Sequence, residues 1–215
     1  ASFELNLNNS GKTLEKTVYL IRHAQSHPSA RLDHSEWPLS PVGLGQAEGL
    51  CGLLEPLGIE VLFSSPFKRC LQTVQPLATK AGVELIVNEG LRERLANKAF
   101  VDDFYETWCR SWDDFNFALP GCESSLAAQR RFVAAVEDIV ARCRHRTIGV
   151  SSHGNVIGLF LNYLDRSFGR KQAEALRNPD VVRIIATDAL VRDREFHLSG
   201  IESITTDSWD TPIQE

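Results

Sequence analysis

The feature that most constrains the fold is a short apolar run at residues 17–21, which stops abruptly at Arg22 and His23. The run is rich in β-branched and aromatic residues, and it is too short for a typical helix. Such a run predicts a strand that is buried on both faces of a parallel sheet. Arg22 and His23 would then lie at the carboxyl end of the strand, where ligands bind in open α/β sheets. Taken alone, however, the pair is more typical of a strand that ends in solvent.

Similar apolar runs alternate with helix-forming segments along the rest of the chain. Two of the helices carry start signals, namely Ser40 before Pro41 and Ser65 before Pro66. Strands are predicted at about residues 59–63, 83–87, 147–151, 181–187 and 190–197, and helices at about residues 41–55, 66–81, 125–144 and 156–164. The last two strands are expected to be antiparallel. This alternation predicts a three-layer α/β/α sandwich with a mostly parallel central sheet.

The chain is expected to form one domain at residues 17–200, between an N-terminal arm at 1–16 and a polar C-terminal tail at 201–215. A shift in composition at about residues 95–120 interrupts the alternation of strands and helices. Aromatic residues at helical spacing predict an amphipathic helix in this insertion: Phe104, Trp108, Trp112 and Phe115. The insertion is equally consistent with a helical lid over the site and with ordinary core packing.

Charge and cysteine content limit the classes of partner and of site. The net charge of −5 leaves no basic footprint for nucleic acid or an anionic membrane, and no apolar run is long enough to span a bilayer. The N-terminus has no leader-like pattern, so a cytoplasmic protein is expected. The five cysteines form no CxxC pair and suggest neither a metal cage nor a disulfide framework. The sequence leaves the oligomeric state open.

Four residues with suitable chemistry are expected to meet at the carboxyl ends of parallel strands: Arg22, His23, Arg69 and His153. They belong to a series of segments that occur in order over about residues 17–164, namely LIRHAQS, LSPVGLGQA, SSPFKRCLQT, LRER, PGCES and SSHGN. In these segments the sequence resembles the histidine phosphatase superfamily, the phosphoglycerate mutase-like family. The resemblance implies phosphoryl transfer at this edge of the sheet.

The resemblance also implies a role for individual residues. A neutral imidazole has a free lone pair, so His23 would attack phosphorus and form a phosphohistidine intermediate. Arg22, Arg69 and His153 would bind the phosphoryl oxygens and stabilise their charge without a metal ion or another cofactor. Glu93 would act as general acid for the leaving oxygen, and afterwards as the base that activates water.

Two positions depart from the usual pattern of the family. Ala24 occupies a place where glycine is more common, which is acceptable if its φ is negative but narrows the pocket slightly. Ser29 stands where many members have a phosphate-contacting asparagine, and its shorter side chain is expected to be a weak substrate-binding group. The remaining histidines match no motif and are expected at the surface or in packing: His27, His34, His145 and His197.

The resulting prediction is a phosphomonoesterase, with a small organic phosphate ester as its partner. The stretch between Glu93 and Glu123 is shorter than the insertion typical of the mutase branch, which favours hydrolysis over mutase chemistry. An aromatic, acidic lid would favour a substrate with an apolar part. Two alternatives stay open, namely a phosphoglycerate mutase and a non-catalytic module that binds a phosphorylated ligand or protein.

Overall fold

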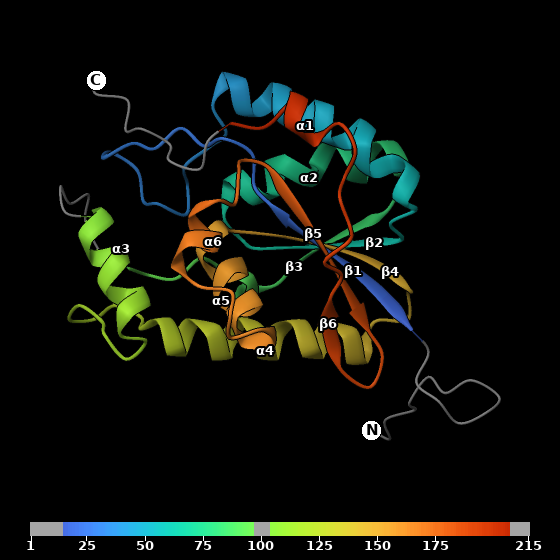
Figure 1. Cartoon of the computed structure of the whole chain (residues 1–215). Helices are drawn as coiled ribbons and strands as arrows, with labels where there is room; N and C mark the ends of the chain where they lie inside the picture. Colours follow the sequence, from blue (N-terminus) through green and yellow to red (C-terminus); the bar gives the residue numbers. More distant parts are fainter. Residues whose placement is uncertain (1–14, 97–103, 207–215) are drawn as a thin grey trace.

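A computed structural model describes residues 15–96 and 104–206, which form a six-stranded sheet with helices on both faces (Figure 1). The strand order is β3-β2-β4-β1-β5-β6. The parallel strands are β1 (Lys16–Arg22), β2 (Val61–Ser64), β3 (Glu84–Val87) and β4 (Thr147–Ser152). The antiparallel strands at one edge are β5 (Asp180–Ala186) and β6 (Leu190–Arg192). The predicted α/β/α sandwich with a mostly parallel sheet is therefore confirmed.

Strand β1 lies in the middle of the sheet, between β4 and β5. Its side chains point alternately into the two apolar cores of the domain. Val18 and Leu20 belong to one core, and Tyr19 and Ile21 belong to the other. A strand that is buried on both faces needs apolar residues at every position, as the uninterrupted run at residues 17–21 predicted.

The helices form the outer layers of the sandwich (Figure 1). One face carries α1 (Pro41–Leu54) and α2 (Lys68–Ala81), and the other carries α4 (Ser125–Arg142) and α5 (Gly154–Leu164). Beside α5 lie α3 (Phe104–Asp113) and the short α6 (Arg170–Glu174). Ser40 caps α1 as predicted, because its hydroxyl accepts from the backbone N–H of Gly43 at 2.9 Å. None of the described helices is both long enough and apolar enough to cross a membrane.

The start of α2 differs from the prediction. The helix begins at Lys68 rather than at Pro66, and Phe67, with an extended backbone, precedes it. Ser65 is therefore not the N-cap, and its Oγ lies 2.8 Å from Nε2 of His153 instead. At the other end of the chain, β6 stops at Arg192, which is earlier than predicted, and the sequence did not indicate α6.

The ends of the domain also need correction. Lys16, which was assigned to the N-terminal arm, is the first residue of β1. Ile201 is buried in the core below α1 and α2, and Thr206 forms a bridge with Asn178, so residues 201–206 belong to the domain. Residues 1–14 of the expected arm, 207–215 of the expected tail and 97–103 of the expected insertion lie outside the described residues.

Candidate active site

The carboxyl edge of the sheet brings together residues from separate segments. Arg22 is the last residue of β1, His23 follows it, and His153 follows β4. The two imidazole rings are in edge contact, with centroids 5.3 Å apart. Arg69, the second residue of α2, donates through Nε to Nε2 of His23 at 3.2 Å. These four residues therefore form the single cluster that the strand pattern predicted.

Several hydrogen bonds fix the position of His23. Its backbone N–H donates to the Ser152 carbonyl at 3.0 Å, and its own carbonyl accepts from Nδ2 of Asn178 at 3.0 Å. Nδ1 lies 2.7 Å from the Ala24 carbonyl, and because a carbonyl can only accept, Nδ1 carries the proton. Nε2 therefore keeps its lone pair, on the side of the ring that faces Arg69.

The surroundings of His23 favour its neutral form. Burial lowers the pKa of His23 well below its ordinary value of 6.5, and the positive charges of Arg69 and Arg22 lower it further. Only 6% of the residue is exposed. At pH 7 the imidazole is therefore uncharged, which is the form that can attack an electrophilic phosphorus.

Arg69 is held in one orientation by groups on both sides of its guanidinium. Nη1 donates to the backbone carbonyl of His34 at 2.6 Å. The guanidinium carbon lies 5.0 Å from the centre of the Phe67 ring and 5.8 Å from that of Trp37, within the range of cation–π contacts. A planar donor fixed in this way is suited to binding two oxygens of one phosphoryl group.

Arg22 packs against the start of α5. Its Nη1 donates to the Leu176 carbonyl at 2.5 Å. A Cβ added at Gly154 would lie 2.7 Å from the guanidinium carbon of Arg22, which is closer than any ordinary contact. A larger residue after His153 would therefore force the guanidinium of Arg22 to shift from this position.

His153 is fully buried at the N-cap position of α5. Its Nε2 lies 2.8 Å from Oγ of Ser65, and its ring is in edge contact with Phe67. Burial, and then the charge of Arg69, lower the pKa of His153 well below 6.5, so its ring is neutral too. The neighbouring Cys70 is also fully buried, and burial raises the pKa of its thiol to about 12. Cys70 therefore stays protonated, as expected for a small packing residue.

Glu93 follows β3 and a short 3₁₀ turn, and its carboxylate lies at the N-terminus of α5. Oε1 accepts from the backbone N–H groups of Arg94 at 2.7 Å and Val156 at 3.2 Å. Oε2 accepts from the backbone N–H of Asn155 at 3.3 Å. The same helix start therefore positions the carboxylate of Glu93 and the imidazole of His153.

Arg131 is a residue of this region that the sequence did not single out. Its guanidinium binds the Glu123 carboxylate through Nε and Nη2, each at 2.8 Å. Nη1 also donates to the carbonyls of Gly90 at 2.7 Å and Arg92 at 2.8 Å, and so supports the loop that carries Glu93. This gives a structural role to Glu123 of the PGCES segment, for which the sequence suggested none.

The two departures from the family pattern have different outcomes. Ala24 is fully buried, and it fits because no described residue other than glycine has a positive φ. The hydroxyl of Ser29 accepts from the backbone N–H of Arg31 at 3.2 Å, within its own loop. Among the described residues, Ser29 forms no hydrogen bond with His23 or Arg69. Its substrate contact therefore stays a prediction.

His34 was assigned to the surface or to packing, but it borders the site. Its carbonyl holds Arg69, and its ring is in edge contact with Phe67, at 5.1 Å between centroids. The side chain is 32% exposed, and burial is the main reason that its pKa is lowered. The loop between β1 and α1 that contains His34 has no regular pattern, so the sequence carried no signal for this position.

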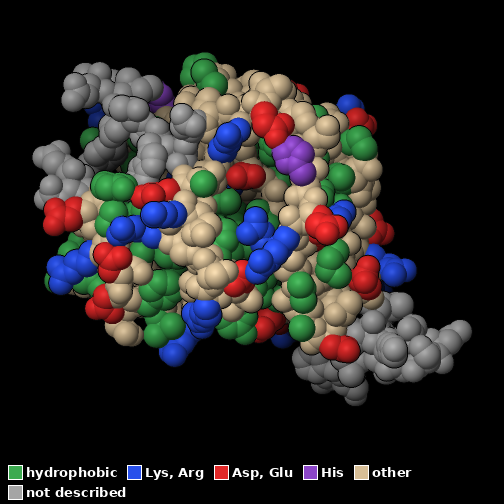
Figure 2. Space-filling model, viewed as in Figure 1, with side chains coloured by type: hydrophobic (Ala, Val, Ile, Leu, Met, Phe, Trp, Pro, Cys, Tyr) green, Lys and Arg blue, Asp and Glu red, His purple; other side chains and the backbone are tan. Residues whose placement is uncertain are grey.

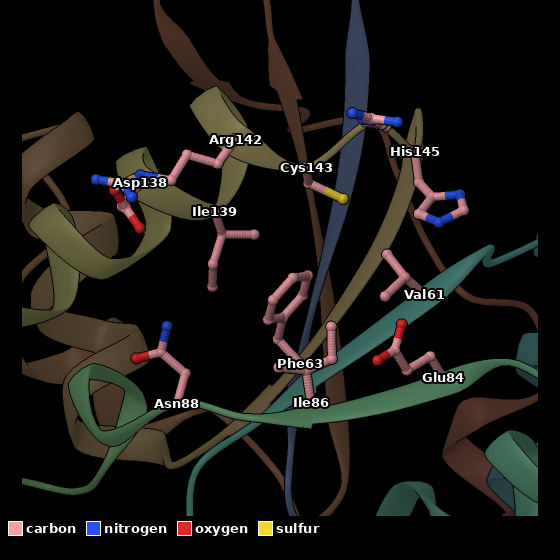
Figure 3. Close-up of a pocket in the computed structure, with 11 residues that line it drawn as sticks. Val61, Phe63, Glu84, Ile86, Asn88, Asp138, Ile139, Arg142, Cys143 and His145 are labelled. Atoms are coloured by element: carbon pink, nitrogen blue, oxygen red, sulfur yellow. The ribbon is translucent and has the colours of Figure 1, made fainter. Parts of the chain in front are cut away.

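A groove of about 360 Å³ lies elsewhere, between the edge of the sheet and the end of α4 (Figure 3). Apolar side chains such as Phe63, Ile86 and Ile139 line it, and none of the predicted site residues does. No group of three or more His, Cys, Asp and Glu side chains among residues 15–96 and 104–206 is arranged to hold a metal ion. On the face seen in Figure 2, acidic and basic side chains are interspersed.

Comparison with known proteins gives consistent results. The family described as "Histidine phosphatase superfamily (branch 1)" matches residues 18–189. The chain is 26% identical over 156 residues to "Putative phosphoserine phosphatase 2" of Hydrogenobacter thermophilus, and the aligned region covers 66% of this chain and 75% of that protein. It is 27% identical over 156 residues to "Probable phosphoglycerate mutase GpmB" of Proteus mirabilis, covering 67% of this chain and 73% of that protein.

Solved structures share the fold at lower sequence identity. A structure of mycobacterial glucosyl-3-phosphoglycerate phosphatase superimposes with a TM-score of 0.67 at 17% identity, covering 87% of this chain and 100% of that chain. At this level of identity the similarity establishes the architecture, not the substrate. The strand order and the helices on both faces are therefore those of a known group of structures.

Proposed function

The chain belongs to the histidine phosphatase superfamily, and on this premise we propose that it is a phosphomonoesterase acting on small organic phosphates. The observation that carries the proposal is His23, a neutral histidine that keeps its lone pair on Nε2, where it accepts a hydrogen bond from the fixed guanidinium of Arg69. That combination suits a nucleophile which attacks a phosphoryl group. The phosphatases among its relatives support hydrolysis as the overall reaction.

In the first step of the proposed reaction, Nε2 of His23 attacks phosphorus in line with the leaving oxygen. The P–N bond forms while the P–O bond to the leaving group breaks, and Glu93 in its protonated form delivers a proton to the departing oxygen. Arg22, Arg69 and His153 bind the phosphoryl oxygens and stabilise their charge. The products of this step are an alcohol and phosphohistidine.

In the second step a water molecule attacks the phosphohistidine. Glu93, now a carboxylate, accepts a proton from the water as its oxygen bonds to phosphorus. The P–N bond breaks and its electron pair returns to Nε2 of His23. Inorganic phosphate leaves, and the enzyme is restored without a metal ion or another cofactor taking part.

The names of the relatives suggest which substrates to test first. They include a phosphoserine phosphatase, phosphoglycerate mutases and a glucosyl-3-phosphoglycerate phosphatase. The groups phosphorylated in these names are small hydroxy acids or derivatives of them. We therefore propose small phosphorylated hydroxy acids as the first substrate class, and the mutase names keep phosphoglycerate isomerisation as the second candidate function.

The test is release of phosphate from an aryl phosphate and from phosphoserine in the presence of EDTA. The parent chain is compared with His23→Ala and with a control variant, His197→Ala. His197 lies on the surface, beside Glu202. We expect activity in the parent and in His197→Ala, and loss of activity in His23→Ala. Activity that survives His23→Ala would overturn the proposal. A folded but inactive parent that isomerises phosphoglycerate would be a mutase, and one that only binds phosphate esters would be a binding module.

A further inference from the structure

The aromatic helix α3 is connected to the site by two hydrogen bonds to one atom. The indole N–H groups of Trp108 and Trp112 both donate to Oδ1 of Asn155, at 3.1 and 3.2 Å. An indole N–H can only donate, so the amide oxygen of Asn155 must face the two rings. The orientation of the amide is therefore determined by this pair of tryptophans.

Asn155 is also one of the residues that hold Glu93. It is the second residue of α5, and its backbone N–H donates to Oε2 of Glu93 at 3.3 Å. The next backbone N–H, that of Val156, donates to Oε1 at 3.2 Å. One residue thus receives both indole N–H groups through its side chain and binds the Glu93 carboxylate through its main chain.

Both tryptophans are well placed to keep this connection rigid. Trp108 is 6% exposed and Trp112 is 8% exposed, and both belong to the core formed with α4 and α5. Trp112 also packs against α5 at Gly158, where an added Cβ would lie 3.3 Å from the indole ring. The buried rings leave α3 little freedom to move relative to the first turn of α5.

We propose that Trp108 and Trp112 are positioning residues for Glu93, and that they act through Asn155. The inference rests on the proposed function of Glu93 as general acid. Loss of the indole N–H groups frees the Asn155 amide to rotate, which loosens the first turn of α5 and the carboxylate bound to it. The reaction then loses part of its proton transfer, while His23, which follows β1, and Arg69, which lies on α2, stay in place. The aromatic segment is in this view a support for the site rather than a lid.

The leaving group of the substrate provides a test that separates this role from ordinary packing. An alkyl phosphate needs a proton on its departing oxygen, whereas an aryl phosphate with an acidic phenol can depart without one. The variant Trp108→Phe/Trp112→Phe keeps both aromatic rings and removes both donors. The quantity to compare is kcat/KM, because it reports the steps up to departure of the leaving group and not the later hydrolysis of phosphohistidine, in which Glu93 acts on both substrates alike. We expect kcat/KM for an alkyl phosphate to fall by about tenfold or more, which is part of the roughly 10²- to 10⁴-fold contribution of general acid catalysis. We expect kcat/KM for the aryl phosphate to change by less than about twofold.

A matched control is available on the same helix. The hydroxyl of Tyr105 donates to Oε1 of Glu174 on α6 at 2.9 Å, so Tyr105→Phe removes a hydrogen bond of α3 that does not reach Asn155. This variant should leave the ratio of alkyl to aryl rates unchanged. In an Asn155→Ala background, the two Trp→Phe changes should have no further effect on the ratio, because the shared acceptor is gone.

Each outcome bears on one of the two proposals. Equal losses on both substrates, or no loss on either, would overturn the positioning role while His23-dependent phosphatase activity remains in the parent. A selective loss that persists in the Asn155→Ala background would also overturn it, because the effect would not pass through Asn155. An inactive parent would instead contradict the proposed function on which the inference rests. Melting temperatures of all variants show whether a change in rate accompanies a change in folding.

Discussion

Lowering the pH from 6.5 to 5.5 should destabilise the fold through two buried histidines of the site. His23 and His153 are neutral in the folded protein, because burial and nearby arginines lower the pKa of each well below 6.5. In the unfolded chain both take up protons near their ordinary pKa of about 6.5. The unfolded state therefore binds more protons over this window, and the free energy of unfolding falls as the pH falls. Integrated from pH 6.5 to 5.5, the effect is about 1 kcal/mol for each histidine and about 2 kcal/mol for both.

Urea denaturation followed by tryptophan fluorescence at the two pH values measures this difference. The double variant His23→Asn/His153→Asn should lose about 2 kcal/mol of the pH dependence, whereas His197→Asn should retain it. Acids with a lowered pKa, such as Glu123, stay ionised throughout this window and do not mask the effect. A double variant with the same pH dependence as the parent would refute the reasoning, because the two rings would then not be the groups that bind protons on unfolding.

Three further predictions concern single side chains. Gly154→Ala should lower kcat by about a hundredfold, because the new methyl group displaces Arg22; an unchanged kcat in steady-state assays would show that the guanidinium has room to move. Arg69→Lys keeps the charge but loses the planar donor, so kcat should fall by about a hundredfold or more at unchanged melting temperature, and a fully active lysine variant would contradict the bidentate role. Arg131→Met leaves the Glu123 carboxylate without its main partner, so urea denaturation should show a loss of about 3 kcal/mol; a variant as stable as the parent would mean that the pair does not support the loop.

The parts of the fold that the sequence predicted are those with local signals. The run before Arg22 indicated a buried strand, because residues 18–21 of β1 alternate between the two cores. Ser40 and Pro41 indicated the start of α1, because a cap and the first turn are adjacent in sequence. The site cluster was predicted for a similar reason. Residues that directly follow parallel strands lie at the same carboxyl edge of the sheet, so the end of each apolar run indicated where Arg22, His23 and His153 would be. The resemblance to a family then added Glu93, which no local pattern identified.

What the sequence did not predict depends on contacts between distant segments. Ser65 and Pro66 have the sequence of a normal helix start, yet α2 begins at Lys68 and the Ser65 hydroxyl lies next to His153, which comes much later in the chain. Arg131 supports the loop at Gly90 from another helix. The pairing of Trp108 with Asn155 likewise joins two helices. In each case the residue type is one that is common in its own segment of the sequence. Its partner becomes evident only when the sheet and helices are packed together.

The central place of β1 has a consequence for biosynthesis. A ribosome makes β1 before the other strands, but its two neighbours in the sheet, β4 and β5, follow only after β2, β3 and α4. Until those strands leave the ribosome, the apolar β1 has no partner and needs protection from aggregation. His23 and the residues around it thus come together only after β4 and β5 have been made. A nascent chain that stops after α4 would lack all activity rather than part of it.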